Sequence, residues 1–75
     1  MPSRRDGRPV EYEVRVAARL DPERWASWFG DMAIQVGADG VTTLRGPVAD
    51  QAALYGLLAR LRDLAVPLLS VNTVE

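Results

Sequence analysis

The sequence contains no cysteine, no histidine and no lysine, and these absences narrow its possible chemistry. Without cysteine there are no disulfides, thiolate metal sites, iron–sulfur clusters or thiol nucleophiles. Without histidine the chain lacks the commonest general base and the commonest metal ligand. All nine basic residues are arginine, so a Schiff-base lysine and a P-loop lysine are also excluded. We therefore predict a protein that is not an enzyme and that holds no metal or cofactor.

Length and charge indicate one small globular domain. The chain has 75 residues, of which 48% are hydrophobic and 25% charged, with a formal net charge of −1. This charge draws the chain neither to nucleic acid nor to anionic lipid, and its apolar runs are too short to span a membrane. The opening "MPSRRDGRP" has no apolar stretch behind its arginines, so we predict a cytoplasmic protein. Residues 1–9 are expected to form a flexible tail and residues 10–75 a single domain.

The segment "VEYEVRVAARL" alternates between apolar and mostly charged residues, which predicts a strand over residues 10–20 with one buried face. The residues predicted to face inward are Val10, Tyr12, Val14, Val16, Ala18 and Leu20. "MAIQV" and "VTTLRGPV" predict two further strands, joined by the hairpin turn "GADG". Pro47 is expected to end the ladder of its strand or to lie at an edge.

Two helices are predicted, each with an aspartate as its N-cap. In "LDPERWASWFG" Asp21 is the cap and Gly30 the stop, and an apolar stripe contains Trp25, Trp28 and Phe29. In the second helix Asp50 is the cap and Pro67 marks the end. Its predicted apolar stripe consists of Leu54, Leu57, Leu58, Leu61, Leu64 and Ala65, and the residues expected to point to water are Arg60, Arg62 and Asp63. "LLSVNTV" predicts the last strand.

The predicted element order is β-α-β-β-α-β, which is the α+β, ferredoxin-like arrangement. We expect two helices on one face of a four-stranded antiparallel sheet, in strand order 4-1-3-2. The RNA-recognition motif shares this topology and stacks bases on aromatic residues of the open sheet face. Here that face would carry Glu11, Glu13 and Arg15 and no aromatic residue. A solvated, salt-bridged face is therefore expected, without a nucleic-acid partner.

The candidate interaction residues are Trp25, Trp28, Tyr55 and Gly56. Two tryptophans on an eight-residue helix either both belong to the core or leave one partly exposed as a contact anchor. Gly56 weakens its helix by about 1 kcal/mol relative to alanine, and the apolar stripe does not require it. We interpret Gly56, with Tyr55 beside it, as an outward place where another chain approaches closely. Gly56→Leu is expected to stabilise the helix and to weaken an oligomer that packs there.

The segments "YEVRV", "RWASWF", "LRGPVADQAALYGLLARLRDL" and "PLLSVNTVE" resemble small uncharacterised proteins of actinobacteria and related bacteria, over residues 11–75. That resemblance implies no known activity and assigns no functional residue. Two functions stay open. One is a protein-interaction domain that self-associates or acts as an adaptor. The other is a regulatory domain that holds a small-molecule effector between subunits, as in the ACT family, to which "GLLARLRDLAVPLLSV" has a superficial likeness.

Overall fold

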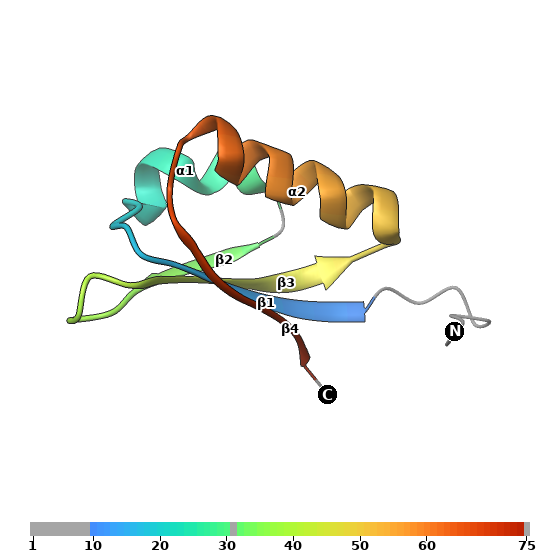
Figure 1. Cartoon of the computed structure of the whole chain (residues 1–75), viewed down its shortest axis with the longest axis horizontal. Helices are drawn as coiled ribbons and strands as arrows, with labels where there is room; N and C mark the ends of the chain where they lie inside the picture. Colours follow the sequence, from blue (N-terminus) through green and yellow to red (C-terminus); the bar gives the residue numbers. More distant parts are fainter. Residues whose placement is uncertain (1–9, 31, 75) are drawn as a thin grey trace.

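The computed structural model describes residues 10–30 and 32–74, which form an antiparallel sheet covered on one face by two helices (Figure 1). The elements in chain order are β1 (Val10–Val16), α1 (Pro22–Phe29), β2 (Ala33–Val36), β3 (Thr42–Val48), α2 (Gln51–Asp63) and β4 (Leu68–Val74). The four strands lie in the order β2-β3-β1-β4, and every neighbouring pair is antiparallel. The predicted ferredoxin-like fold and strand order are thus confirmed, whereas the predicted tail lies outside the described residues.

The hydrophobic core lies between the sheet and the helices, and alternate residues of the central strands supply much of it. Its buried apolar members are Val14, Val16, Leu20, Phe29, Met32, Leu44, Leu57 and Leu61. The opposite face of the sheet is polar. There the Arg45 Nε donates to a Glu11 carboxylate oxygen at 3.0 Å, and both side chains are about half exposed. An ion pair this accessible contributes little to stability, but it agrees with the predicted salt-bridged face.

Strand β1 is shorter than predicted, because it ends at Val16 and not at Leu20. Its pairing with β4 shifts register between Arg15 and Val16, and the chain then bends away from the sheet. Leu20 is still buried, as its place in the alternation requires, but it reaches the core from a loop. The alternation therefore predicted burial correctly and the strand's length wrongly, because residues 17–20 keep alternating between exposed and more buried positions after the chain has left the strand.

Both predicted N-caps are present. The Asp21 carboxylate accepts a hydrogen bond from the Glu23 N–H at 3.1 Å, and the Asp50 carboxylate accepts one from the Ala53 N–H at 2.8 Å. Gly30 follows α1 with a φ of 65°, a left-handed conformation that suits glycine. Each helix thus begins where its capping aspartate satisfies a backbone N–H that has no partner within the helix.

The β2–β3 hairpin and the position of Pro47 follow from turn chemistry. Gly40 has a φ of 84°, and the Asp39 carboxylate accepts from the Val41 N–H at 3.0 Å, which closes the turn. Pro47 lies inside β3 and pairs with Glu11. Because β2 pairs only with residues 42–45, Pro47 lies past the end of that ladder, where a missing N–H costs no hydrogen bond to β2.

Helix α2 ends differently from its prediction, because Ala65 does not belong to its apolar stripe. The helix stops at Asp63, and Ala65 adopts a φ of 58°. The Ala65 N–H donates to the Arg62 carbonyl at 2.9 Å, and the Val66 N–H donates to the Leu61 carbonyl at 3.5 Å. This is the Schellman pattern of helix termination, which normally places glycine where Ala65 stands.

Ala65→Gly is expected to raise the free energy of unfolding by about 0.5–1 kcal/mol. The substitution removes a Cβ from a left-handed residue that is already exposed, so no core contact is lost. Urea unfolding followed by circular dichroism measures the change. An equal or lower stability would show that the greater freedom of glycine in the unfolded chain outweighs the relief of strain.

Candidate interaction surfaces

The two tryptophans of α1 form an edge-to-face pair with centroids 6.1 Å apart and an interplanar angle of 76°. Trp25 is partly buried and packs against the core, whereas Trp28 is 41% exposed. Phe29 is the buried anchor of the helix. Of the two alternatives for the aromatic stripe, the structure therefore shows the one in which one tryptophan reaches the surface.

Arg60 is exposed, as the sequence predicted, and it also makes a contact that the sequence did not predict. Its Nη1 donates to the Trp28 carbonyl at 2.9 Å, and its guanidinium lies 6.0 Å from the centre of the Trp28 ring. A cation at the last turn of a helix also interacts favourably with the negative end of the helix dipole. Arg60 thus links α2 to the end of α1, a contact between residues 32 positions apart in the chain. Trp28 is consequently partly covered within its own chain.

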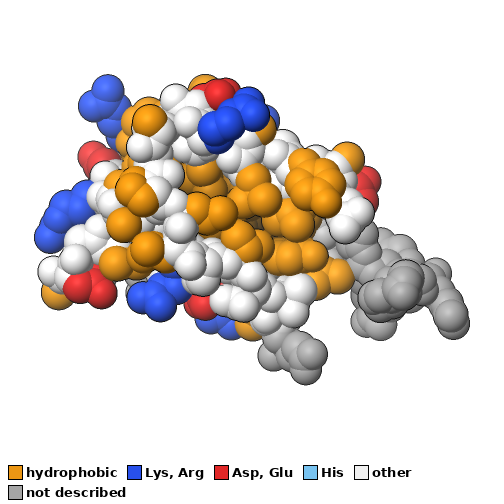
Figure 2. Space-filling view, viewed as in Figure 1, with side chains coloured by type: hydrophobic (Ala, Val, Ile, Leu, Met, Phe, Trp, Pro, Cys, Tyr) orange, Lys and Arg blue, Asp and Glu red, His pale blue; other side chains and the backbone are white. Residues whose placement is uncertain are grey.

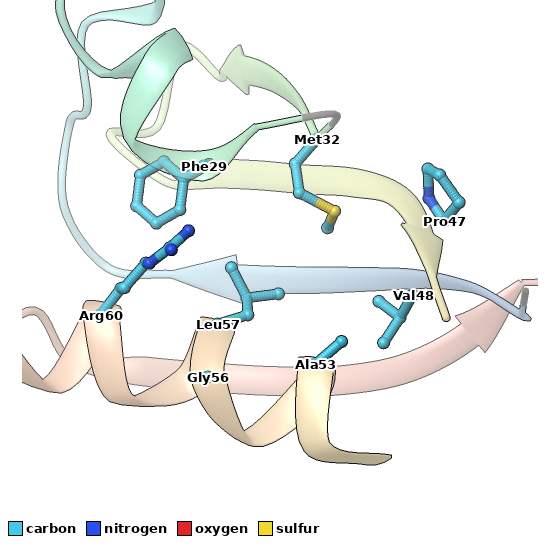
Figure 3. Close-up of a pocket in the computed structure, with 8 residues that line it drawn as sticks. All are labelled: Phe29, Met32, Pro47, Val48, Ala53, Gly56, Leu57 and Arg60. Atoms are coloured by element: carbon cyan, nitrogen blue, oxygen red, sulfur yellow. The ribbon is translucent and has the colours of Figure 1, made fainter. Parts of the chain in front are cut away.

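Gly56 lies on the flank of α2 that faces α1, where it lines an apolar depression of about 280 Å³, the interhelix groove (Figure 3). The groove is lined by Phe29, Met32, Pro47, Val48, Ala53, Gly56, Leu57 and Arg60. In Figure 3, α2 supplies one wall, and Phe29 and Met32 lie across from it. A Cβ built on Gly56 would meet no atom within 4 Å, so the glycine is not needed for packing inside this chain.

Tyr55 lies on the other flank of α2 and is 60% exposed. Helical spacing places it in one row with Leu58 and Arg62, which border a second depression of about 290 Å³, the α2–β4 groove. That groove is lined by Leu58, Leu61, Arg62, Ala65, Val66 and Leu68. Figure 2 shows hydrophobic side chains gathered along the hollow below α2. The structure therefore separates Tyr55 from Gly56, which are neighbours in sequence but line different surfaces.

The sequence-based candidates did not include Leu68 and Leu69 at the start of β4, which are 50% and 53% exposed. The missed signal is the absence of any charged residue from the whole strand Leu68–Val74. The predicted strand order already placed this strand at an edge of the sheet. An edge strand without charge is unusual, since natural edges are commonly protected by charged side chains.

The described residues include several large exposed apolar side chains but no cluster of potential metal ligands. Within residues 10–30 and 32–74 no three potential metal-ligating side chains come together. Over the same part of the chain, neither helix combines the length and the apolar character needed to cross a bilayer. Leu68 lines the α2–β4 groove, and the two exposed residues Tyr55 and Leu69 belong to the helix and the strand that form it.

The comparisons with known proteins identify a family but no activity. A family model described as a domain of unknown function, DUF8691, matches residues 11–72. No curated protein and no solved structure matches the chain. The family model covers nearly the whole of the described domain, from the second residue of β1 into β4.

Proposed function

The chain belongs to the DUF8691 family, whose function is unknown, and we propose that it acts as a non-enzymatic protein-interaction domain. The observation that carries this proposal is the exposure of Leu68 on the α2–β4 groove, together with that of Tyr55 and Leu69 on the helix and strand that form the groove. Contiguous exposed apolar surface is typical of protein-interaction sites, which supports this proposal. The partner is either a second copy of the chain or a protein for which the domain serves as an adaptor.

The setting that we propose is the cytoplasm of a bacterium. Its support is the likeness of residues 11–75 to small bacterial proteins and the absence of cysteine, which is compatible with a reducing compartment.

The composition of the groove favours protein contact over catalysis. Apart from Arg62, its lining side chains are aliphatic. Tyrosine combines a large apolar ring with a hydroxyl and loses little conformational entropy on binding, which makes Tyr55 a suitable contact anchor. Arg62 pairs with the adjacent Asp63 at 3.5 Å, and both side chains are largely exposed, so the Arg62 guanidinium is accessible to a partner.

Tyr55→Ala is expected to weaken the association of this domain at least about tenfold, since interface anchors contribute upwards of about 1.4 kcal/mol. Size-exclusion chromatography with light scattering measures self-association at high micromolar concentration, and a pull-down with the tagged chain measures capture of other proteins. Arg15→Ala, on the opposite face of the sheet, is the matched control and should change neither.

Association that Tyr55→Ala weakens and Arg15→Ala preserves would support the proposal. A strict monomer that captures no protein in a Tyr55-dependent way would contradict it.

The interhelix groove supports a second candidate, a regulatory domain that binds a small effector. Its volume of about 280 Å³ is close to the lower end of the range of ligand pockets, about 300–1,000 Å³. It offers an apolar lining with one guanidinium, that of Arg60. A regulatory domain of this kind would hold the effector between the groove and a second subunit, as in the ACT family.

Thermal-shift measurements with amino acids and nucleotides test this second candidate, because a ligand that binds the native state raises the melting temperature. Gly56→Leu should fill the groove and abolish the ligand-dependent shift, while the unliganded protein becomes more stable by about 0.5–1 kcal/mol. Gly56→Ala gains the same helical stability but leaves most of the groove open. A shift that persists in Gly56→Leu would place the ligand elsewhere, and no shift with any compound would argue against the function.

A further inference from the structure

We propose that the partner of this domain is a second copy of the same chain, joined by antiparallel pairing of the two β4 edges about a two-fold axis at Asn72. The inference rests on the proposed interaction function and specifies its partner and geometry. It predicts a continuous sheet of eight strands with all helices on one face.

The free edge of β4 is the first observation. β4 is the last strand in the sheet order, and within residues 10–30 and 32–74 it pairs with β1 alone. It has seven residues without a charge, whereas β2, at the other edge, has only four residues. Natural sheets protect their edges by shortness, charge or covering. β2 is protected by its shortness. β4 is longer and uncharged, so covering by another chain is the protection that remains for it.

The register follows from the position of the β-bulge. Residues 70–74 pair with residues 15–11 one for one, whereas Leu69 has no partner in β1. Regular pairing with a second copy is therefore available over residues 70–74, whose central residue is Asn72. A two-fold axis there places Asn72 opposite its own counterpart and Val71 opposite Thr73 of the other copy. An axis perpendicular to the sheet keeps inward side chains inward in both copies.

The chemistry at the axis is compatible with self-pairing. Asn72 is exposed and lies on the same face as Glu13, its partner in β1. An amide side chain carries both a donor and an acceptor, so two of them can bond to each other across a two-fold axis. The net charge of −1 per chain creates no appreciable repulsion between copies.

A stable dimer needs more buried area than the β4 edge can provide, so α2 must also contribute to the interface. A standard interface buries about 800 Å² per partner, and the whole chain exposes 5117 Å². A five-residue strand edge is only about 17 Å long and cannot bury so much alone. Tyr55 is exposed on α2, in one helical row with Leu58 and Arg62, which line the α2–β4 groove, and both copies would present α2 on the same face of the joined sheet. Figure 2 shows hydrophobic side chains gathered in the hollow below α2. This helical row supplies the remaining apolar contact.

A charge swap at the axis tests the proposal with the full-length chain. Asn72→Lys puts two like charges directly opposite each other in the dimer, and it should raise the dimer dissociation constant at least about tenfold. Within one copy the new lysine lies beside Glu13, so the fold is retained. Asn72→Glu should also weaken the homodimer. An equimolar mixture of the two variants should form a heterodimer about as tightly as the wild type, measured by light scattering.

Cross-linking provides an independent measurement, because the chain has no cysteine of its own. Opposite residues in an antiparallel pair have Cα atoms about 4.5–5.5 Å apart, within the range of a disulfide. Asn72→Cys should therefore form a disulfide-linked dimer under mild oxidation. Thr73→Cys is a control at another exposed position of the same strand, and its two copies would lie about 8 Å apart and should cross-link more slowly.

Three results would overturn the inference: wild-type chain that stays monomeric, charge variants that dimerise like the wild type, or Thr73→Cys that cross-links faster than Asn72→Cys. The proposed function fails separately. Tyr55-dependent association that neither charge variant affects would reject pairing at β4 and leave the interaction function standing. A monomer that captures nothing would reject both.

Discussion

Leu44→Ala is expected to lower the free energy of unfolding by about 3–4 kcal/mol, because it leaves a cavity that a small domain cannot close. Leu44 is fully buried in β3, between Val14 of β1 and Ile34 of β2. A chain of 75 residues has a total stability of about 4–11 kcal/mol. The variant should therefore lose about a quarter or more of the total stability. Urea unfolding followed by circular dichroism measures the loss.

The control for this substitution is Leu44→Met, which nearly conserves the side-chain volume and should cost less than about 1.5 kcal/mol. If the alanine variant lost no more stability than the methionine variant, the sheet and helices would have to close over the vacated space. That result would contradict the close-packed core described above.

Thr42→Val should destabilise the fold by about 2–3 kcal/mol, although it preserves the shape of the side chain. Thr42 is fully buried, and its hydroxyl accepts from the Leu20 N–H at 3.0 Å and donates to the Ala18 carbonyl. Valine removes both bonds and leaves two backbone groups of the β1–α1 connection without these partners. Amide hydrogen exchange at Leu20 should accelerate together with the loss of global stability.

Thr42→Ser is the matched control, since it keeps the hydroxyl and removes only a methyl group. It should retain protection of the Leu20 amide while losing about 1 kcal/mol for the lost methyl. Equal stability of the valine variant and the wild type would show that the Thr42 hydroxyl is not needed to hold the connection.

Much of the fold could be predicted because its signals are local. Asp21 and Asp50 mark helix starts through hydrogen bonds to residues two or three positions away. The alternation from Val10 to Val16 identifies β1, and right-handed connections then leave few topologies for six elements. Each of these inferences needs only neighbouring residues or a general rule of chain geometry.

The errors occurred where distant residues determine the local structure. β1 ends at Val16 because the bulge against β4 and the Thr42 hydroxyl draw the following residues into a loop. The periodic stripe predicted that Ala65 would belong to α2, but the turn into β4 requires a left-handed residue there. Arg60 is exposed as predicted, but its hydrogen bond to the Trp28 carbonyl was missed because another helix supplies that carbonyl.

The sequence predicted which residues of the candidate site are unusual, but not where they lie relative to one another. The sequence identified Trp25, Trp28, Tyr55 and Gly56 as unusual, but the structure distributes them over separate surfaces. Tyr55 and Gly56 diverge because consecutive helical residues point about 100° apart. The exposed leucines of β4 become notable only once that strand is seen to have one neighbour.

The sequence by itself determined the element order, the helix starts, the fold class and the absence of cysteine, histidine and lysine chemistry. These properties follow from residue identity and from spacing over a few positions. Only the tertiary structure decided which apolar side chains remain exposed, where β1 ends and which edge of the sheet stays open. Those outcomes depend on how residues such as Thr42 and Ala18, 24 positions apart, meet in space, and local spacing carries no information on such contacts.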